Sequence, residues 1–366
     1  MTEETLANAV RAALARVVDP ELRRPITELD MVREVRVTDG EATVDLRLTI
    51  VGCPAAATIE RDVREAAAAV EGVTAVTVDV GVMTPAERDA LTARLRGTRA
   101  MPFGPDSLTR ILCVTSGKGG VGKSTVTANL AVSFARAGLA VGVVDADVFG
   151  FSIPGLLGID GARPTRVGEL ILPPVAYDVK AISIGMFTDP GTAVSWRGPM
   201  LHRTMQQFLT DVFFGDLDVL LIDLPPGTGD VAISLGQLLP HAEVIVVTTP
   251  QAAAASVAER SALVARQTGQ TVVGVVETMA GIAQPDGSVL EVFGSGGGLT
   301  VAERLGVPLL ASIPLSVAVR EGGDSGVPVV VSHPEDAGAV ALDALASSLR
   351  SRGRGLVGRR LGVRVD

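Results

Sequence analysis

The chain has 366 residues, of which 47% are hydrophobic and 20% charged, and this composition excludes a disordered protein. Its net charge of −9 argues against nucleic-acid binding through bulk electrostatics, and no apolar run of about 18 residues is present to span a membrane. Two cysteines, Cys53 and Cys113, exclude a disulfide framework and favour a reducing cytoplasm. We therefore expect a globular, cytoplasmic protein with no nucleic-acid or membrane partner.

The first 97 residues predict a small α/β domain. Asp39-Gly40 is a hairpin signal between two apolar segments. The predicted elements are a helix at 2–17, strands at 34–37, 42–50 and 73–80, and helices at 54–70 and 85–95. Residues 98–107 are rich in proline, glycine and arginine, so we expect a linker there.

From Leu108 onwards, short and continuously apolar runs alternate with helical stretches. The runs are 111–114, 140–144, 181–184, 219–222, 244–247, 272–276 and 309–313. This pattern predicts an α/β domain at 108–349 with a doubly wound, mostly parallel sheet, whose ligands bind at the carboxyl ends of the strands. The last segment, 350–366, carries six arginines among glycines, and we expect a solvated basic tail.

The chain contains only three lysines, Lys118, Lys123 and Lys180, and two of them lie in one glycine-rich run. That run matches Gly-x-x-x-x-Gly-Lys-Ser, follows a predicted strand and opens a predicted helix, so it indicates a phosphate-binding loop of a P-loop NTPase. Lys123 is expected to reach the β- and γ-phosphates of ATP, and Ser124 to ligate Mg²⁺. The predicted nucleotide-binding residues are Gly117, Lys118, Gly119, Gly120, Val121, Gly122, Lys123, Ser124 and Thr125.

Carboxylates follow two further buried strands. Asp145 and Asp147 come after the run at 140–144, where they either position water or Mg²⁺ for attack on the γ-phosphate or cap a helix or turn. Asp223 ends the run at 219–222 and is expected to hold Mg²⁺ through water. The segment Pro225 to Gly229 then forms a rigid loop, in which the Gly227 N–H is placed to sense the γ-phosphate.

These motifs carry a specific resemblance. Within the deviant Walker ATPases (the MinD/ParA group), the chain resembles the Mrp/ApbC family of iron–sulfur carriers, and residues 1–97 resemble the small SufT/PaaD-like domain often fused to it. The segments concerned are 117–124, 145–154, 195–200, 218–230, 293–298 and 313–315, with 19–22 and 48–54 in the small domain. The resemblance implies a homodimeric ATPase that hands iron–sulfur clusters to apoproteins or assembly factors. It also implies that Lys118 reaches the nucleotide bound to the partner subunit, and that Thr278 and Pro314 lie beside the base of the nucleotide.

The chain departs from that family at one site. Most members carry Cys-x-x-Cys where this chain has Ala280 to Gly287, which contains no cysteine, so the usual bridging cluster cannot form there. Cys113 lies inside an apolar strand and is expected to be a buried core thiol. Cys53 is either a cluster ligand or transfer thiol, or a small capping residue at a tight turn.

Three hypotheses follow. In the first, the protein is a slow, Mg²⁺-dependent and partner-coupled ATPase that carries clusters, with Lys118, Lys123, Asp145 and Asp147 as its catalytic residues. In the second, it is a ParA/MinD-like spatial switch on DNA or a membrane. Its acidic net charge argues against this, and so do the glycines of its tail, which disfavour an amphipathic helix. In the third, it is an ATP-dependent adaptor of iron–sulfur assembly that holds no cluster, and the missing Cys-x-x-Cys favours it.

Overall fold

The computed structural model describes residues 2–50, 55–96, 101–188, 198–284, 286 and 288–352. The chain divides into two compact units. The first contains Met1–Ser107, Gly161–Ala176 and Lys180–Asp216, and the second contains Leu108–Asp160, Tyr177–Val179 and Leu217–Asp366. The boundaries predicted for the two domains, the linker and the tail stay predictions. Cys53, residues 98–100 of the predicted linker and the tail from 353 onwards lie outside the described residues.

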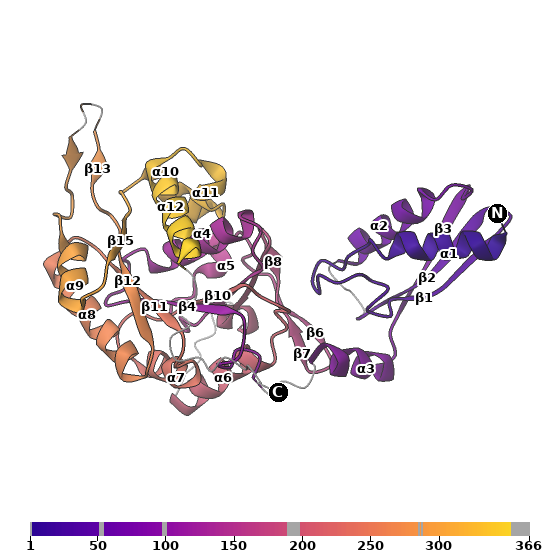
Figure 1. Ribbon diagram of the computed structural model, residues 1–366, viewed down its shortest axis with the longest axis horizontal. Helices are drawn as coiled ribbons and strands as arrows, with labels where there is room; N and C mark the ends of the chain where they lie inside the picture. The colour runs from indigo at the N-terminus through magenta and orange to yellow at the C-terminus, as the bar shows by residue number, and fades with distance from the viewer. Residues whose placement is uncertain are drawn as a thin grey trace, which may run out of the picture. The chain divides into compact units, whose positions relative to one another are not determined.

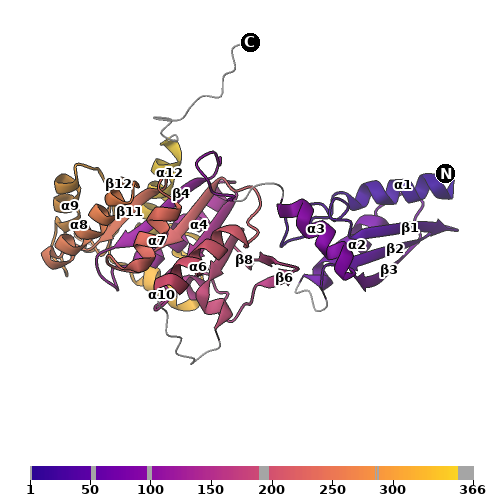
Figure 2. The same ribbon diagram turned by 90° about the horizontal axis from the view of Figure 1, so that it is seen from below.

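The first unit contains a three-stranded sheet in the order β1-β2-β3 with helices beside it (Figures 1 and 2). Strands β1 (Val32–Thr38) and β2 (Glu41–Leu48) form the predicted hairpin, and β3 (Ala75–Val82) pairs with β2 in parallel. Asp39 and Gly40 both have positive φ, as the tight hairpin turn requires. The helices are α1 (Glu3–Leu14), α2 (Ala56–Ala68) and α3 (Pro85–Arg96).

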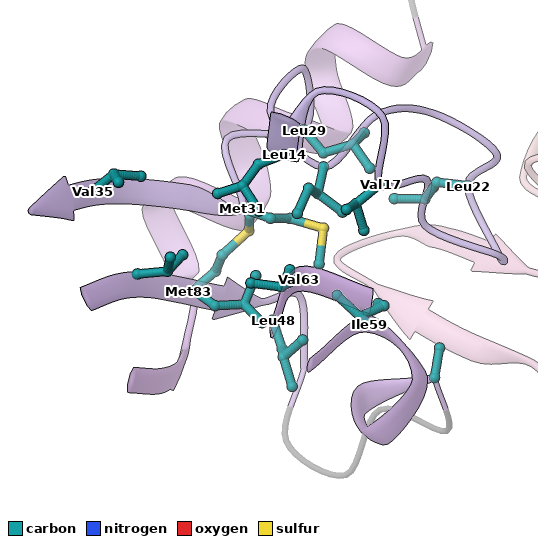
Figure 3. Packing of buried hydrophobic residues seen from close by; sticks show 14 of the residues in the cluster. Leu14, Val17, Leu22, Leu29, Met31, Val35, Leu48, Ile59, Val63 and Met83 are labelled. Carbon is teal, nitrogen blue, oxygen red and sulfur yellow. The ribbon is translucent and has the colours of Figure 1, made fainter. Parts of the chain in front are cut away.

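A continuous apolar core fills this unit (Figure 3). Leu14 and Leu29 are among its fully buried members, together with Ile59 and Val63 from one face of α2. The same core includes residues from the later segments of the unit, which contain β6 (Thr165–Val167), β7 (Leu170–Leu172), β8 (Val175–Ala176), most of β9 (Val179–Ser183), a 3₁₀ turn η1 (Ile184–Phe187) and α6 (Gly198–Thr210).

The larger sheet has eight strands in the order β15-β12-β11-β4-β10-β5-β9-β8. The six from β15 to β5 belong to the second unit, and each is parallel to its neighbours. They are β4 (Arg110–Ser116), β5 (Val141–Asp145), β10 (Val219–Asp223), β11 (Glu243–Thr248), β12 (Thr271–Glu277) and β15 (Leu309–Ser312). The α/β fold with a mostly parallel sheet is therefore confirmed.

Helices cover both faces of this sheet (Figure 1). Helix α4 (Lys123–Arg136) packs on β4, β5 and β10 and carries α12 (Ala337–Ser351) on its outer side. On the other face, α8 (Ala252–Gln267) packs on β4, β11 and β12, with α7 (Asp230–Leu238) and α9 (Gly297–Leu305) beside it. The remaining elements are α5 (Ile153–Leu156), α10 (Val317–Ser325), α11 (Val329–Ser332) and a hairpin of β13 (Ile282–Ala283) and β14 (Val289–Leu290). Of the helices in the described part of the chain, none has the length and apolar character that a bilayer crossing requires.

Candidate nucleotide site

The glycine-rich loop connects the buried strand β4 to helix α4. Gly120 and Gly122 have φ of 75° and 77°, a backbone conformation that favours glycine, and Gly122 caps the helix. A β-carbon at Gly117 would lie 2.3 Å from the backbone nitrogen of Ala258 in α8. Because backbone cannot move aside as a side chain can, this position admits only glycine, and α8 fixes the start of the loop.

The loop lysine and the strand-end carboxylate form a buried ion pair. Lys123 Nζ lies 2.6 Å from Asp223 Oδ2, and the side chains are 6% and 0% exposed. The Ser124 hydroxyl donates to the same oxygen at 2.6 Å, and the Thr127 hydroxyl lies 2.8 Å from Asp223 Oδ1 and 3.0 Å from the Lys123 carbonyl. Three segments therefore converge on one carboxylate, as predicted. They are the glycine-rich loop, the start of α4 and the end of β10.

Asp145 lies beside that group, because β5 and β10 pair in register at Asp145 and Asp223. Burial raises the pKa of Asp145 to about 7, and the negative charge of Asp223 adds to the effect. Backbone N–H groups work against this rise: Asp145 Oδ2 accepts from Ser152 and Ile153, and Oδ1 accepts from Asp147. The carboxylate thus fixes the segment leading into α5, which matches the capping alternative, and it also adds negative charge next to Asp223.

Asp147 is nearly buried, and its Oδ1 accepts a hydrogen bond from the Gly150 N–H at 3.1 Å. That bond closes a tight turn at the carboxyl edge of the sheet. The role predicted for Asp147 in positioning water stays a prediction.

The predicted phosphate-sensing loop at 225–229 is hydrogen-bonded to Ser116, the residue just before the glycine-rich loop. Gly227, at φ 87°, donates its N–H to the Ser116 carbonyl at 2.8 Å. The Ser261 hydroxyl of α8 lies 3.2 Å from that carbonyl and 3.3 Å from the Gly227 carbonyl. Ser261 therefore connects the two loops that are expected to surround the γ-phosphate.

Thr278, predicted to line the base, follows β12 and is buried. Its hydroxyl lies 2.6 Å from the Val121 carbonyl and 3.1 Å from the Thr248 carbonyl, so it binds the glycine-rich loop itself. Pro314 is half-buried in the segment after β15, where Ile313 donates a backbone hydrogen bond to the Glu277 carbonyl and Leu315 donates one to the Gly281 carbonyl. The roles of Thr278 and Pro314 at the base stay predictions.

Lys118 differs from Lys123 in its surroundings. Its side chain is exposed, and within the described ranges it forms no ion pair with a carboxylate. Gly119 is exposed beside it, and Thr125 is half-buried in the first turn of α4. The role of Lys118 at the nucleotide of a partner subunit stays a prediction.

The cysteines offer no cluster site in the described part of the chain. Burial raises the pKa of Cys113 to about 12, as expected for a core thiol, and Gln270 contacts its sulfur. No group of three or more His, Cys, Asp or Glu side chains there is arranged to hold a metal ion. Cys53 lies outside the described residues, so its predicted role is untested.

Sequence reasoning missed two residues of the site, Thr127 and Ser261. Thr127 lies four residues after Lys123, one helical turn along α4, and that spacing was a usable signal. Ser261 lies far along the chain on a long helix, and nothing in its local sequence marks it.

The loop fits a nucleotide with Mg²⁺. Ser124 and Asp223 offer the oxygen ligands that Mg²⁺ prefers, and the space beyond Gly120 is open, since a β-carbon there would meet nothing within 4 Å. A doubly wound parallel sheet with this loop, its lysine and a strand-end aspartate defines the class of P-loop NTPases.

Comparison with known proteins supports the assignment to the P-loop NTPases. A family model described as NUBPL iron-transfer P-loop NTPase matches residues 107–350, and one described as iron-sulfur cluster assembly protein matches residues 7–80. The chain belongs to the family of NUBPL iron-transfer P-loop NTPases. Its N-terminal segment carries the iron-sulfur cluster assembly domain.

Relatives of nearly equal length carry a common name. An iron-sulfur cluster carrier protein of Mycobacterium tuberculosis is 56% identical, with 97% of this chain and 96% of the relative covered. One from Synechocystis is 40% identical, with 94% and 97% covered. A solved nucleotide-binding protein from Archaeoglobus fulgidus, in complex with ADP and with cobalt found in it, is 36% identical with a TM-score of 0.53, covering 59% of this chain and 86% of that one.

Proposed function

We propose that this protein binds and hydrolyses ATP with Mg²⁺ and uses the nucleotide state to carry iron–sulfur clusters to target apoproteins. The contact of Lys123 and Ser124 with one oxygen of Asp223 carries the ATPase part, because it assembles the loop lysine and both Mg²⁺ ligands at one point. The names of the relatives support the cluster part. The cytoplasmic location stays a prediction.

Each site residue has a role in in-line transfer of the γ-phosphoryl group to water. Backbone N–H groups of the glycine-rich loop and Lys123 hold the phosphates, and Ser124 and Asp223 hold Mg²⁺, which neutralises phosphate charge. Asp147 positions the attacking water, with Asp145 in support. Water bonds to the γ-phosphorus as the bond to the β–γ bridging oxygen breaks, which releases phosphate and ADP.

We propose a homodimer as the active form, with Lys118 of each subunit at the nucleotide of the other. The exposure of Lys118 supports this arrangement. Hydrolysis is then slow in the isolated subunit, because charge stabilisation by cations dominates such transfers.

The ATPase assignment is tested with Lys123→Ala. ATP turnover should be abolished, because the variant loses the cation that holds the β- and γ-phosphates. Arg304→Ala, which removes an exposed cation paired with Glu259 on the surface, is the control and should keep wild-type turnover. Near-wild-type hydrolysis by Lys123→Ala would show that the site lies elsewhere.

The adaptor alternative remains because Ala280 to Gly287 contains no cysteine. Anaerobic reconstitution with iron and sulfide separates it from the carrier. A carrier that uses Cys53 gains visible absorbance, which Cys53→Ser loses and Cys113→Ala keeps, since Cys113 is a buried and protonated thiol. Equal absence of absorbance in all three proteins favours the adaptor.

A further inference from the structure

The side chain of Thr278 contacts the glycine-rich loop directly. Thr278 follows β12 and is 5% exposed. Its hydroxyl oxygen lies 2.6 Å from the Val121 carbonyl and 3.1 Å from the Thr248 carbonyl. A hydroxyl has one proton, and O–H···O bonds span about 2.5–3.0 Å, so the proton is donated to Val121. The donor capacity of this side chain is therefore used on the loop.

That hydrogen bond sets the direction of one peptide group in the loop. The peptide group between Val121 and Gly122 is planar and trans, so its C=O and its N–H point in opposite directions. Because the hydroxyl of Thr278 holds the carbonyl, the Gly122 N–H points away from Thr278. Among the described residues, no hydrogen bond uses this N–H. The loop can therefore offer it to phosphate, and its direction depends on Thr278.

Thr278 also lies close to the next residue of the loop. A β-carbon at Gly122 would lie 3.6 Å from the methyl group of Thr278 and 3.8 Å from its β-carbon, which is ordinary van der Waals contact. Gly122 is the residue that caps α4, so its position also sets where the helix begins. Thr278 therefore lies beside both ends of this peptide group, the Val121 carbonyl and the Gly122 α-carbon.

The strand end that carries Thr278 is fixed by its own contacts. The Thr278 N–H donates to the Thr248 carbonyl at 2.9 Å, and the Ile313 N–H donates to the Glu277 carbonyl at 2.7 Å. The Glu277 carboxylate accepts a hydrogen bond from the Gly298 N–H at 2.6 Å. A β-carbon at Gly298 would lie 2.6 Å from the β-carbon of Glu277, so only glycine lets α9 start this close to β12. Contacts with β11, α9 and the segment after β15 thus hold Thr278 in place against the loop.

We propose that Thr278 is a positioning residue of the nucleotide site, which orients the Gly122 N–H toward the phosphates by holding the Val121 carbonyl. This inference rests on the ATP site proposed above. The effect of Thr278 depends on the phosphates and not on the base, because its proton is donated to the loop. A side chain that contacted only the base would instead affect only those ligands that carry a base.

The test compares a ligand that has a base with one that has none. Thr278→Val keeps the shape of the side chain and removes the hydroxyl, whereas Thr278→Ser keeps the hydroxyl. Calorimetric titration of the full-length protein with Mg²⁺ and either a non-hydrolysable ATP analogue or tripolyphosphate measures the two affinities. We expect Thr278→Val to weaken both ligands by the same factor, about fivefold for one net hydrogen bond, and Thr278→Ser to bind both as the wild type does.

Thr109→Val is the control for a general loss of stability. The buried Thr109 hydroxyl donates to the Leu217 carbonyl at 2.9 Å. Thr109 comes just before β4, so it lies at the end of the sheet opposite the glycine-rich loop. This variant loses a comparable buried hydrogen bond and should keep wild-type affinity for both ligands.

If Thr278→Val does not fold, Thr278→Ala takes its place, because water can then reach the Val121 carbonyl, and it should show the same pattern with a smaller loss. Weaker binding of the ATP analogue alone, or of neither ligand, overturns the inference. An equal loss in Thr109→Val overturns it as well, since the effect would then be one of stability. A wild type that binds neither ligand would refute the ATP site itself, on which the inference depends.

Discussion

At the residue scale, Thr127 holds Asp223, the carboxylate that we propose binds Mg²⁺. Its hydroxyl bridges Asp223 Oδ1 and the Lys123 carbonyl. Thr127→Val keeps the shape but leaves a buried carboxylate oxygen short of a donor, which should cost about 1–3 kcal/mol of stability. We expect ATP turnover to fall about tenfold, with a raised requirement for Mg²⁺.

The matched control for this change is Thr210→Val. Thr210 makes the same bond to the carbonyl four residues earlier, that of Gln206, and its hydroxyl also contacts a carboxylate, that of Asp211, which lies outside the nucleotide site. If both variants lose the same turnover, the effect belongs to helical threonines in general, and the role of Thr127 at Asp223 is refuted.

Cys113 gives a second prediction at this scale. Its pKa of about 12 lies above the ordinary thiol value of 9.0, so at pH 8 only about one molecule in 10,000 carries the reactive thiolate. Iodoacetamide at pH 8 should leave Cys113 unmodified in the folded protein and alkylate it in denaturant. Peptide mass spectrometry separates it from Cys53, and rapid labelling of Cys113 in the folded state would contradict its burial in β4.

At the scale of elements, α8 is coupled to the loop that carries Gly227. The Ser261 hydroxyl has one proton for two carbonyls, those of Ser116 and Gly227. If the Gly227 N–H leaves Ser116 for a γ-phosphate, Ser261 compensates by donating to Ser116. Ser261→Ala should therefore weaken binding of a non-hydrolysable ATP analogue about fivefold relative to ADP, which corresponds to one net hydrogen bond of about 1 kcal/mol.

Calorimetric titration of both nucleotides measures this ratio. Ser256→Ala is the control, because Ser256 lies on the exposed side of the same helix and its hydroxyl bonds the Ala253 carbonyl. Equal losses for ADP and for the analogue would show that Ser261 supports the fold and takes no part in sensing.

The sequence predicted the elements that carry strong patterns. The buried parallel strands followed from uninterrupted apolar runs, and the Asp39–Gly40 turn from its own residues. The short strands β6, β7 and β8 were missed, because two or three residues show no periodicity.

At the scale of the whole molecule, the proposed homodimer can be tested by mutating the exposed Lys118. Lys118→Ala should bind ATP as the wild type does but hydrolyse it at least a hundredfold more slowly, because the developing charge loses its cation from the partner. Light scattering of the wild type should show a dimer with a non-hydrolysable ATP analogue and a monomer with ADP. Full turnover by Lys118→Ala at low protein concentration would contradict action between subunits.

The ion pair between Lys123 and Asp223 has a consequence for how the ligand enters. The ammonium lies against the carboxylate that would otherwise face Mg²⁺, and the carboxylate satisfies the cation that would otherwise face phosphate. Binding of the ligand would therefore require Lys123 to exchange Asp223 for phosphate, and Asp223 to exchange Lys123 for Mg²⁺. Phosphate taking Lys123 alone would leave a fully buried Asp223 without its counterion, and Mg²⁺ taking Asp223 alone would do the same to the lysine. Each half of the incoming ligand is disfavoured without the other, so we expect the protein to bind the metal–nucleotide complex in preference to either component.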